Sequence, residues 1–171
     1  MSETIVITDA SVLINFLVLD RAGLLARLTG HRFVVTDHVR AEITDHYPEQ
    51  VQRLEAAFFA GVVEEIRVSS LQEVQLFAQL TATGLGIGEC SAIAVATHRQ
   101  LTLAIDDKRA VKKIKAIGFP LTIYSTESLV VLMIQQSVLT ISEADTMKHE
   151  WEHNHRFRMP FDSFAERLTA D

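Results

Sequence analysis

The sequence predicts an α/β fold in which a central, mostly parallel sheet is covered by helices on both faces. Short runs of β-branched residues alternate with longer helical patterns over the first 124 residues. Parallel strands need such helical crossovers, so this alternation is typical of a doubly covered sheet. With 48% hydrophobic residues and only 7 Gly and 3 Pro in 171 residues, the chain has the composition of one compact domain.

Strands and helices are predicted in turn along this part of the chain. The strands are expected at 4–8, 33–36, 62–68, 101–105 and 121–124. The helices are expected at 11–28, 37–46, 48–60, 70–83, 87–99 and 107–117, several of them opened by Ser, Asp or Pro. Gly61, Gly84 and Gly118 stand where helices should stop, because glycine readily adopts the conformation that ends a helix.

From Ser125 onward the chain has a helical pattern. One helix is expected over 125–141 and a second over about 142–156, followed by a loose acidic and aromatic end. We therefore predict a main domain over residues 1–136 and a C-terminal helical extension over 137–171 that belongs to the same structural unit.

Cysteine content and hydropathy predict a soluble protein of the cytoplasm. Cys90 is the one cysteine, so no intramolecular disulfide can form and a reducing compartment is expected. The N-terminus has no basic region, and Asp9 and Asn15 interrupt the apolar stretch that follows it, which does not suit a signal peptide. The apolar run from 129 to 134 is far shorter than the ~20 residues that a membrane span needs.

The charge distribution argues against a general nucleic-acid coating protein. The formal net charge is -6, whereas such proteins draw their affinity from neutralising phosphates. A local basic surface is still expected, because cations crowd the stretch directly after 106–107. This run is either an ordinary solvated helix face or a binding surface, and it consists of Lys108, Arg109, Lys112, Lys113 and Lys115.

Four apolar stretches of the chain end in carboxylates, namely Asp9, Glu42, Glu89 and the pair Asp106 and Asp107. Ligands of parallel sheets gather at the carboxyl ends of strands, so the aspartates that end two predicted strands are expected at one edge. An ionised carboxylate near an apolar core needs a cation or a shifted pKa. Several such acids therefore predict a shared metal site.

The two glutamates also have simpler interpretations. Glu89 shares a helix face with Ala92 and Ile93, so it is expected to point toward the sheet, but a first-turn glutamate also suits the helix dipole. Glu42 shares a face with Val39, and it could equally be a surface residue beside apolar ones.

Taken together, the four stretches resemble the PIN-domain family, the nucleases that include VapC-type toxins of toxin-antitoxin pairs. They follow the family's order and spacing. The stretches that carry the resemblance are Thr8-Asp9-Ala10-Ser11-Val12-Leu13-Ile14, Val39-Arg40-Ala41-Glu42-Ile43, Gly86-Ile87-Gly88-Glu89-Cys90-Ser91-Ala92-Ile93-Ala94 and Ile105-Asp106-Asp107-Lys108-Arg109.

The resemblance implies a three-layer α/β/α fold with an acidic pocket for one or two Mg²⁺ or Mn²⁺ ions. The catalytic and metal-binding acids would be Asp9, Glu42, Glu89 and Asp107, with Asp106 as a further ligand. We favour Asp107 for the fourth position because its distance to Gly118 suits the family pattern better. Ser11 matches a hydroxyl that supports the first acid. The implied activity is endoribonuclease, the implied partner is an antitoxin protein, and a homodimer is expected.

This sequence departs from the family pattern in three places. The third acid is Glu89 where the family more often has Asp, the fourth position is a doubled aspartate, and the helical tail beyond about residue 137 is longer than a toxin needs. The first two departures keep the charge and leave the metal site plausible. The tail leaves the partner and the oligomeric state open.

The chemistry supports this interpretation independently. Mg²⁺ binds through a few carboxylates plus water and substrate phosphate, without His or Cys. Such ions activate a water for in-line attack on a phosphodiester and neutralise the developing charge, so no protein nucleophile is needed. The basic run would lie beside the pocket and hold the RNA backbone through Lys108, Arg109, Lys112 and Lys113.

Two alternatives remain. The first is a binding or regulatory module that keeps the PIN-like fold without cleaving. The second is a zinc metalloprotease, because His149-Glu150-Trp151-Glu152-His153 matches both the H-E-x-x-H and the H-x-x-E-H signatures. A third ligand is missing nearby and the rest of the chain has the pattern of a parallel α/β domain, so a solvent-facing helix anchored by Met147 and Trp151 is favoured.

Overall fold

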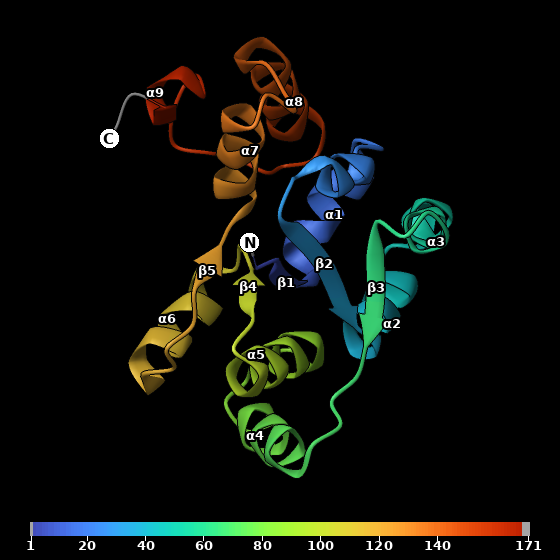
Figure 1. Ribbon diagram of the computed structural model, residues 1–171, viewed down its shortest axis with the longest axis vertical. Helices are drawn as coiled ribbons and strands as arrows, with labels where there is room; N and C mark the ends of the chain where they lie inside the picture. The colour runs from blue at the N-terminus through green and yellow to red at the C-terminus, as the bar shows by residue number, and fades with distance from the viewer. Residues whose placement is uncertain (1, 169–171) are drawn as a thin grey trace.

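The protein is built on a five-stranded parallel sheet, described here from a computed structural model covering residues 2–168 (Figure 1). The strand order is β3-β2-β1-β4-β5, and each neighbouring pair is parallel. The strands are β1 (Thr4–Thr8), β2 (His31–Thr36), β3 (Val63–Ile66), β4 (Thr102–Ala104) and β5 (Ile123–Tyr124). Each predicted strand is present, with ends that differ by up to a few residues.

Helices connect the strands and continue after the last one. They are α1 (Ala10–Val18), α2 (Asp37–His46), α3 (Val51–Phe59), α4 (Leu71–Thr81), α5 (Ile87–Arg99), α6 (Lys108–Ile117), α7 (Thr126–Gln135), α8 (Ile141–Asn154) and α9 (Ala165–Leu168), with 3-10 turns η1 (Ala22–Arg27) and η2 (Pro48–Gln50). Within residues 2–168, no helix has the length and apolar character needed to cross a membrane.

Alternating strand residues divide the core into two layers of apolar packing. Val6 and Phe33 belong to a cluster that includes residues of α1, α2, α3, α7 and α8, while Ile7 and Val34 belong to a cluster with residues of α4, α5 and α6. This period of two is what a strand buried on both faces produces. The predicted three-layer α/β/α fold is therefore confirmed.

Two predicted helices are interrupted by residues with positive φ. The helix expected over 11–28 ends at Val18, because Asp20 has a φ of 55°, which an α-helix does not allow, and η1 follows. The helix expected over 125–141 ends at Gln135, and Ser137 has a φ of 60°. Neither position is a glycine, so the sequence carried no clear stop signal there.

Smaller differences concern helix starts and the C-terminus. The predicted helix over 48–60 begins as the 3-10 turn η2 and becomes α-helical at Val51. The second tail helix starts at Ile141 because Thr140 and Glu143 form a reciprocal capping box, with both bonds at 3.0 Å. The short helix α9 was not predicted. Gly118 ends α6 with a φ of 88°, as expected.

The C-terminal extension packs against the sheet domain through its aromatic residues. Trp151 is fully buried, its ring meets the Phe16 ring edge to face at 5.9 Å, and its Nε1 donates to the Asn15 carbonyl at 2.7 Å. Phe164 is buried in the same apolar cluster. The extension therefore shares a core with the sheet domain, and its last three residues, 169–171, lie outside the described residues.

The histidine motif on α8 is arranged as a surface feature. Trp151 points into the core while His149 and Glu150 are exposed, and Glu152 pairs with Lys148 at 2.7 Å. The His149 and His153 rings stack on each other at 3.8 Å, and His153 Nδ1 lies 2.8 Å from the His149 carbonyl. This arrangement supports the solvent-facing helix and gives no support to a zinc protease.

Candidate metal centre

The first and fourth acids lie side by side because β1 and β4 are paired in parallel. Thr8 is in register with Ala104, and the Asp9 backbone N–H donates to the Ala104 carbonyl at 2.8 Å. Asp9 leaves β1 and caps α1, whereas Asp106 and Asp107 follow β4 and lead into α6. The carboxyl ends of the two central strands thus place these acids at one edge of the sheet, as predicted.

Ser11 ties the first acid to the neighbouring strand end. Its Oγ and its backbone N–H both donate to Asp9 Oδ2, at 2.7 and 3.1 Å. The same Oγ accepts from the Asp106 backbone N–H at 3.1 Å. Asp9 is therefore held in one orientation, with Oδ2 engaged and Oδ1 left buried and without a partner. The predicted supporting role of Ser11 has a direct structural basis in this orientation.

The two adjacent aspartates have different surroundings. Both oxygens of Asp106 accept hydrogen bonds, Oδ1 from the Thr126 N–H at 2.9 Å and Oδ2 from Thr126 Oγ1 at 2.5 Å and Asn15 Nδ2 at 2.9 Å. Asp107 uses Oδ1 alone to cap α6, accepting from the N–H groups of Arg109 and Ala110. Asp106 thus fastens α7 and α1 to the strand end, and Asp107 has the freer carboxylate.

The two glutamates reach the same place from α2 and α5. Glu89 Oε1 accepts from the Gly86 N–H at 3.3 Å, while Oε2 is buried without a hydrogen bond. Glu42 Oε2 is also buried without a partner, and a Cβ on Gly88 would clash with it. The absence of a side chain at Gly88 therefore gives the Glu42 carboxylate its space.

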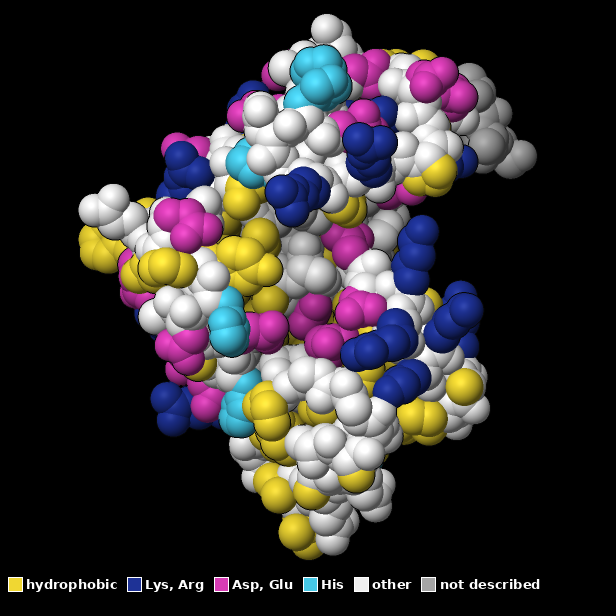
Figure 2. All heavy atoms as spheres, turned by 180° about the vertical axis from the view of Figure 1, so that it is seen from behind, with side chains coloured by type: hydrophobic (Ala, Val, Ile, Leu, Met, Phe, Trp, Pro, Cys, Tyr) yellow, Lys and Arg dark blue, Asp and Glu magenta, His cyan; other side chains and the backbone are white. Residues whose placement is uncertain are grey.

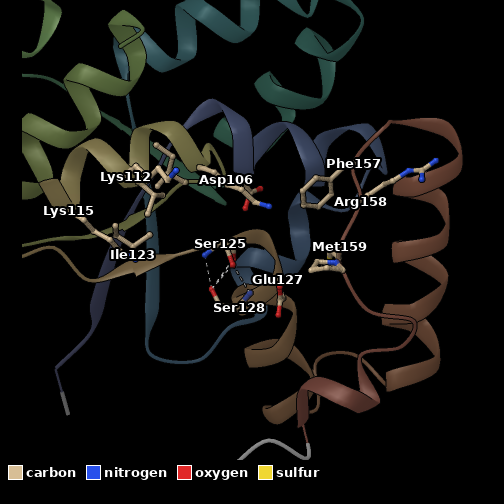
Figure 3. Close-up of a pocket in the computed structure, with 14 residues that line it drawn as sticks. Asp106, Lys112, Lys115, Ile123, Ser125, Glu127, Ser128, Phe157, Arg158 and Met159 are labelled. Atoms are coloured by element: carbon tan, nitrogen blue, oxygen red, sulfur yellow. Dashed lines mark hydrogen bonds between the residues drawn. The ribbon is translucent and has the colours of Figure 1, made fainter. Parts of the chain in front are cut away.

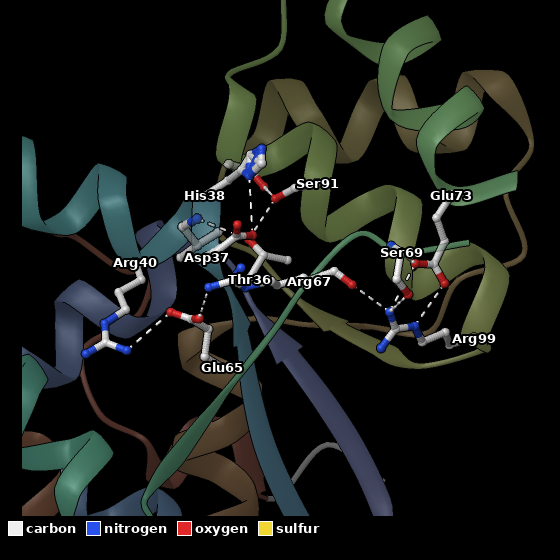
Figure 4. A network of polar contacts seen from close by, with 12 residues as sticks. Thr36, Asp37, His38, Arg40, Glu65, Arg67, Ser69, Glu73, Ser91 and Arg99 are labelled. Atoms are coloured by element: carbon white, nitrogen blue, oxygen red, sulfur yellow. Dashed lines mark hydrogen bonds and ion pairs between the residues drawn. The ribbon is translucent and has the colours of Figure 1, made fainter. Parts of the chain in front are cut away.

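A polar link that sequence reasoning missed sets α2 and α5 against each other. Thr36 Oγ1 accepts from the Val39 N–H at the start of α2 and lies 2.7 Å from Ser91 Oγ, which donates to the Gly88 carbonyl (Figure 4). This chain of bonds connects the first turns of the two glutamate-bearing helices. The sequence could have indicated Thr36 as a helix cap, because it stands between a predicted strand and a predicted helix. It could not indicate the partner Ser91, which is distant in sequence.

A second pair in the same view fixes the outer end of α5. Arg99 Nε and a terminal guanidinium nitrogen donate to the two carboxylate oxygens of Glu73 on α4, at 2.9 and 3.0 Å (Figure 4). The Arg99 hydrogen bond lowers the pKa of the buried Glu73 to about 2. Such a bidentate pair holds the two helices in register.

The acids at the sheet edge are electrostatically strained. Burial raises the pKa of Asp9 and Glu42, and the negative charge of Asp9 adds to the rise at Glu42. Burial together with the charges of Asp9 and Asp107 raises the pKa of Glu89 to about 7. Burial also raises the pKa of Asp106 against the hydrogen bonds from Thr126. A cation nearby would lower the pKa of each of these carboxyl groups, because it stabilises the charged form.

Buried oxygens without hydrogen-bond partners are concentrated on the acids of this site. Four buried side-chain oxygens lack hydrogen-bond partners among the described residues, and three of them belong to Asp9, Glu42 and Glu89. Within residues 2–168, no group of three or more His, Cys, Asp or Glu side chains forms a ready metal cage. Mg²⁺ suits such an open set, because it keeps several waters and uses few carboxylates.

The surface around these acids carries charge of both signs. Acidic side chains gather in a hollow at the middle of one face, with Lys and Arg along one side and His on the other (Figure 2). The predicted basic run divides into two groups. Lys113 Nζ donates to the Thr83 carbonyl and Arg109 to the Gly84 carbonyl, while Lys108 and Lys112 line a separate cavity beside Asp106.

Two other sequence motifs have structural roles. The glycine-rich segment 84–88 leads from α4 into α5, and Gly86 is the N-cap of α5, so the segment connects two helices. Cys90 is buried in the apolar cluster under α5, and burial raises the pKa of its thiol. A buried, protonated thiol is a packing group and not a nucleophile.

Comparison with known proteins decides the family. The family model described as a PIN domain matches residues 5–168. The chain belongs to the PIN-domain family. The match spans the sheet domain and most of the extension, so this PIN domain includes the tail helices. A comparison with curated proteins returns no match.

Solved structures show the same fold at low sequence identity. The PIN domain is similar to PAE2754 from Pyrobaculum aerophilum, with 14% identity, a TM-score of 0.55, and coverage of 78% of this chain and 91% of that one. It is also similar to VapBC-1 from nontypeable Haemophilus influenzae, with 16% identity, a TM-score of 0.52, and coverage of 72% and 98%. These likenesses concern the fold.

Proposed function

We propose that this PIN domain is a metal-dependent endoribonuclease. Its carboxylates Asp9, Glu42, Glu89 and Asp107 would hold one or two Mg²⁺ or Mn²⁺ ions, supported by Asp106 and Ser11. The observation that carries the proposal is the set of unpaired buried oxygens on Asp9, Glu42 and Glu89, which come from three separate elements. Burying three carboxylate oxygens without partners costs free energy in the metal-free protein, and a bound cation would offset that cost.

The roles of the residues follow from their contacts. A bound divalent ion would supply an activated water and neutralise charge on the phosphate under attack. Ser11 donates to Asp9 Oδ2 and leaves Oδ1 without a partner, so that Oδ1 would be available to an ion, and Gly88 leaves room for the Glu42 carboxylate. Lys108 and Lys112, which line the neighbouring cavity, would hold the substrate backbone. Arg109 and Lys113 would steer RNA less directly, because both contact the 83–84 loop.

The biological setting is part of the same proposal. The likeness to VapBC-1 from nontypeable Haemophilus influenzae supports the proposal that this chain is the toxin of a type II toxin-antitoxin pair. A cognate antitoxin protein and a homodimer are the proposed partners, and the cytoplasm is the proposed location. If expression of this chain alone arrests growth, co-expression with a small DNA-binding protein that is encoded beside it should relieve the arrest.

The decisive experiment measures RNA cleavage and metal binding together. Asp9→Asn and Glu89→Gln should each abolish cleavage of single-stranded RNA in Mg²⁺ or Mn²⁺ and weaken Mn²⁺ binding in calorimetry. Glu64→Gln is the matched control, since Glu64 is an exposed acid on the edge strand β3. Cleavage by either site variant at the wild-type rate would show that these acids do not hold the catalytic ion.

A second candidate is a PIN domain that binds without cleaving. The observation in its favour is that no group of three or more ligating side chains within residues 2–168 forms a ready metal cage. This candidate predicts RNA or protein binding with no metal-dependent cleavage of any tested RNA. Mn²⁺ binding that depends on Asp9, with cleavage that also depends on it, would exclude this candidate.

A further inference from the structure

A cavity lies directly beside the acids, between the sheet domain and the C-terminal extension. Its volume is about 480 Å³, and its lining comes from α6, the β5–α7 connection and the segment after α8 (Figure 3). Ligand sites of proteins commonly measure roughly 300–1,000 Å³. Asp106 lies on its wall and Asp107 is the next residue, so the cavity borders the proposed metal centre.

One wall of the cavity is positively charged. Lys108, Lys112 and Lys115 line it at a spacing of four and three residues, which places them on one face of α6. The acids that share the cavity are already engaged. Glu127 pairs with an arginine of α9 at 2.9 Å, and Asp106 accepts its three hydrogen bonds. The lysines are thus left for an anion, and a phosphate is the anion that an adjacent nuclease centre would bring.

The C-terminal extension supplies the opposite wall, which holds the aromatic Phe157 and the apolar Met159 on either side of Arg158 in the sequence. Phe157 and Met159 lie across the cavity from Lys112 and Lys115, with Asp106 between the two walls (Figure 3). The Phe157 ring packs edge to face on Trp151 at 5.6 Å, and its backbone N–H donates to the Trp151 carbonyl at 3.1 Å. Because Trp151 is fixed in the core, the half-buried Phe157 ring is held in place beside the lysines.

We infer that this cavity binds one unpaired nucleotide of the RNA next to the bond that is cut. The lysines of α6 hold its phosphate, and its base lies against the Phe157 ring. Base stacking on an aromatic side chain requires a base that is not in a duplex, so the cavity selects single-stranded RNA. The inference rests on the proposed nuclease function and assigns the extension a role, as the substrate wall opposite α6.

Binding measurements without divalent metal test this directly, because no cleavage then occurs. The probe is a fluorescent oligouridylate of about ten nucleotides, compared with an abasic chain of equal length and with an RNA duplex. Lys112→Gln should weaken binding of both single-stranded probes and lower the salt dependence of log K by about 0.7. Arg32→Gln is the matched control, since Arg32 lies near the amino end of β2, at the opposite edge of the sheet.

The aromatic wall needs its own variants. Phe157→Leu keeps an apolar group against Trp151 and should weaken oligouridylate binding about fivefold or more, with no effect on the abasic chain. Phe157→Trp should restore the loss. Thermal unfolding of each variant checks that the extension stays docked. The stacking role would be overturned if Phe157→Leu bound oligouridylate as tightly as wild type does.

Two further outcomes separate this inference from its competitors. If an oligoglutamate peptide bound more tightly than oligouridylate in a Lys112-dependent manner, the cavity would be a docking site for an acidic protein and the inference would fail. The nuclease proposal is judged separately, by cleavage in Mn²⁺ with Asp9→Asn. Both the nuclease proposal and this inference are supported if Asp9→Asn abolishes cleavage and Phe157→Leu weakens oligouridylate binding in the absence of metal.

Discussion

The strained carboxylates should make the metal-free protein less stable as the pH rises, and Glu89→Gln should remove the share of that loss that Glu89 causes. Burial raises the Glu89 pKa from 4.5 to about 7. Between these values the folded protein binds the proton more tightly than the unfolded chain does. The free energy of unfolding therefore falls as the pH rises through this window, and the loss is complete above the folded pKa.

The size of the effect follows from the two pKa values. A shift of one pKa unit corresponds to about 1.4 kcal/mol, so Glu89 alone would lower stability by about 2 kcal/mol between about pH 5.5 and pH 8. The Glu89 side chain is part-exposed, and solvent screening reduces this to about 1 kcal/mol. The glutamine amide that the substitution introduces cannot ionise, and its oxygen can still accept the Gly86 N–H bond.

Urea unfolding in EDTA at several pH values measures the difference. Wild type should lose about 1 kcal/mol more than Glu89→Gln over this range. The exposed-acid control Glu64→Gln should retain the wild-type slope. Added Mn²⁺ should restore wild type at high pH and have a much smaller effect on Glu89→Gln. Parallel pH profiles for wild type and Glu89→Gln would refute the reasoning.

Three further sets of variants test neighbouring contacts. Gly88→Ala should weaken Mn²⁺ binding about tenfold while the protein stays folded, because a Cβ would displace the Glu42 carboxylate; unchanged calorimetry would contradict this. Asp106→Asn should lower the free energy of unfolding in urea by about 1–3 kcal/mol, because the groups that donate to Asp106 lose an acceptor. Asp107→Asn should mainly weaken Mn²⁺ binding. The reverse pattern would exchange the roles of the two aspartates. Glu73→Gln should remove stability that wild type keeps above about pH 4.5 and loses as the pH falls toward 2; equal acid unfolding profiles would count against the Arg99 pair.

Much of the fold could be predicted because its signals are local. Buried parallel strands appear in the sequence as short β-branched runs, and helices between them show their apolar face and their caps within a few residues. The acids that end β1 and β4 were likewise visible, because any parallel sheet brings the carboxyl ends of adjacent strands together. Helix ends at Asp20 and Ser137 were missed, since their positive φ has no reliable sequence signal.

The layered fold, the position of Asp9 at a strand end and the inward face of Glu89 could all be predicted from residues close together in the sequence. The different surroundings of Asp106 and Asp107 became visible only in the folded chain, because they depend on Asn15 and Thr126, which come from α1 and α7. The tertiary structure also decided that the extension faces the α6 lysines. The physical reason is that periodicity and caps act over a few residues, whereas a carboxylate's surroundings depend on every segment that packs against it.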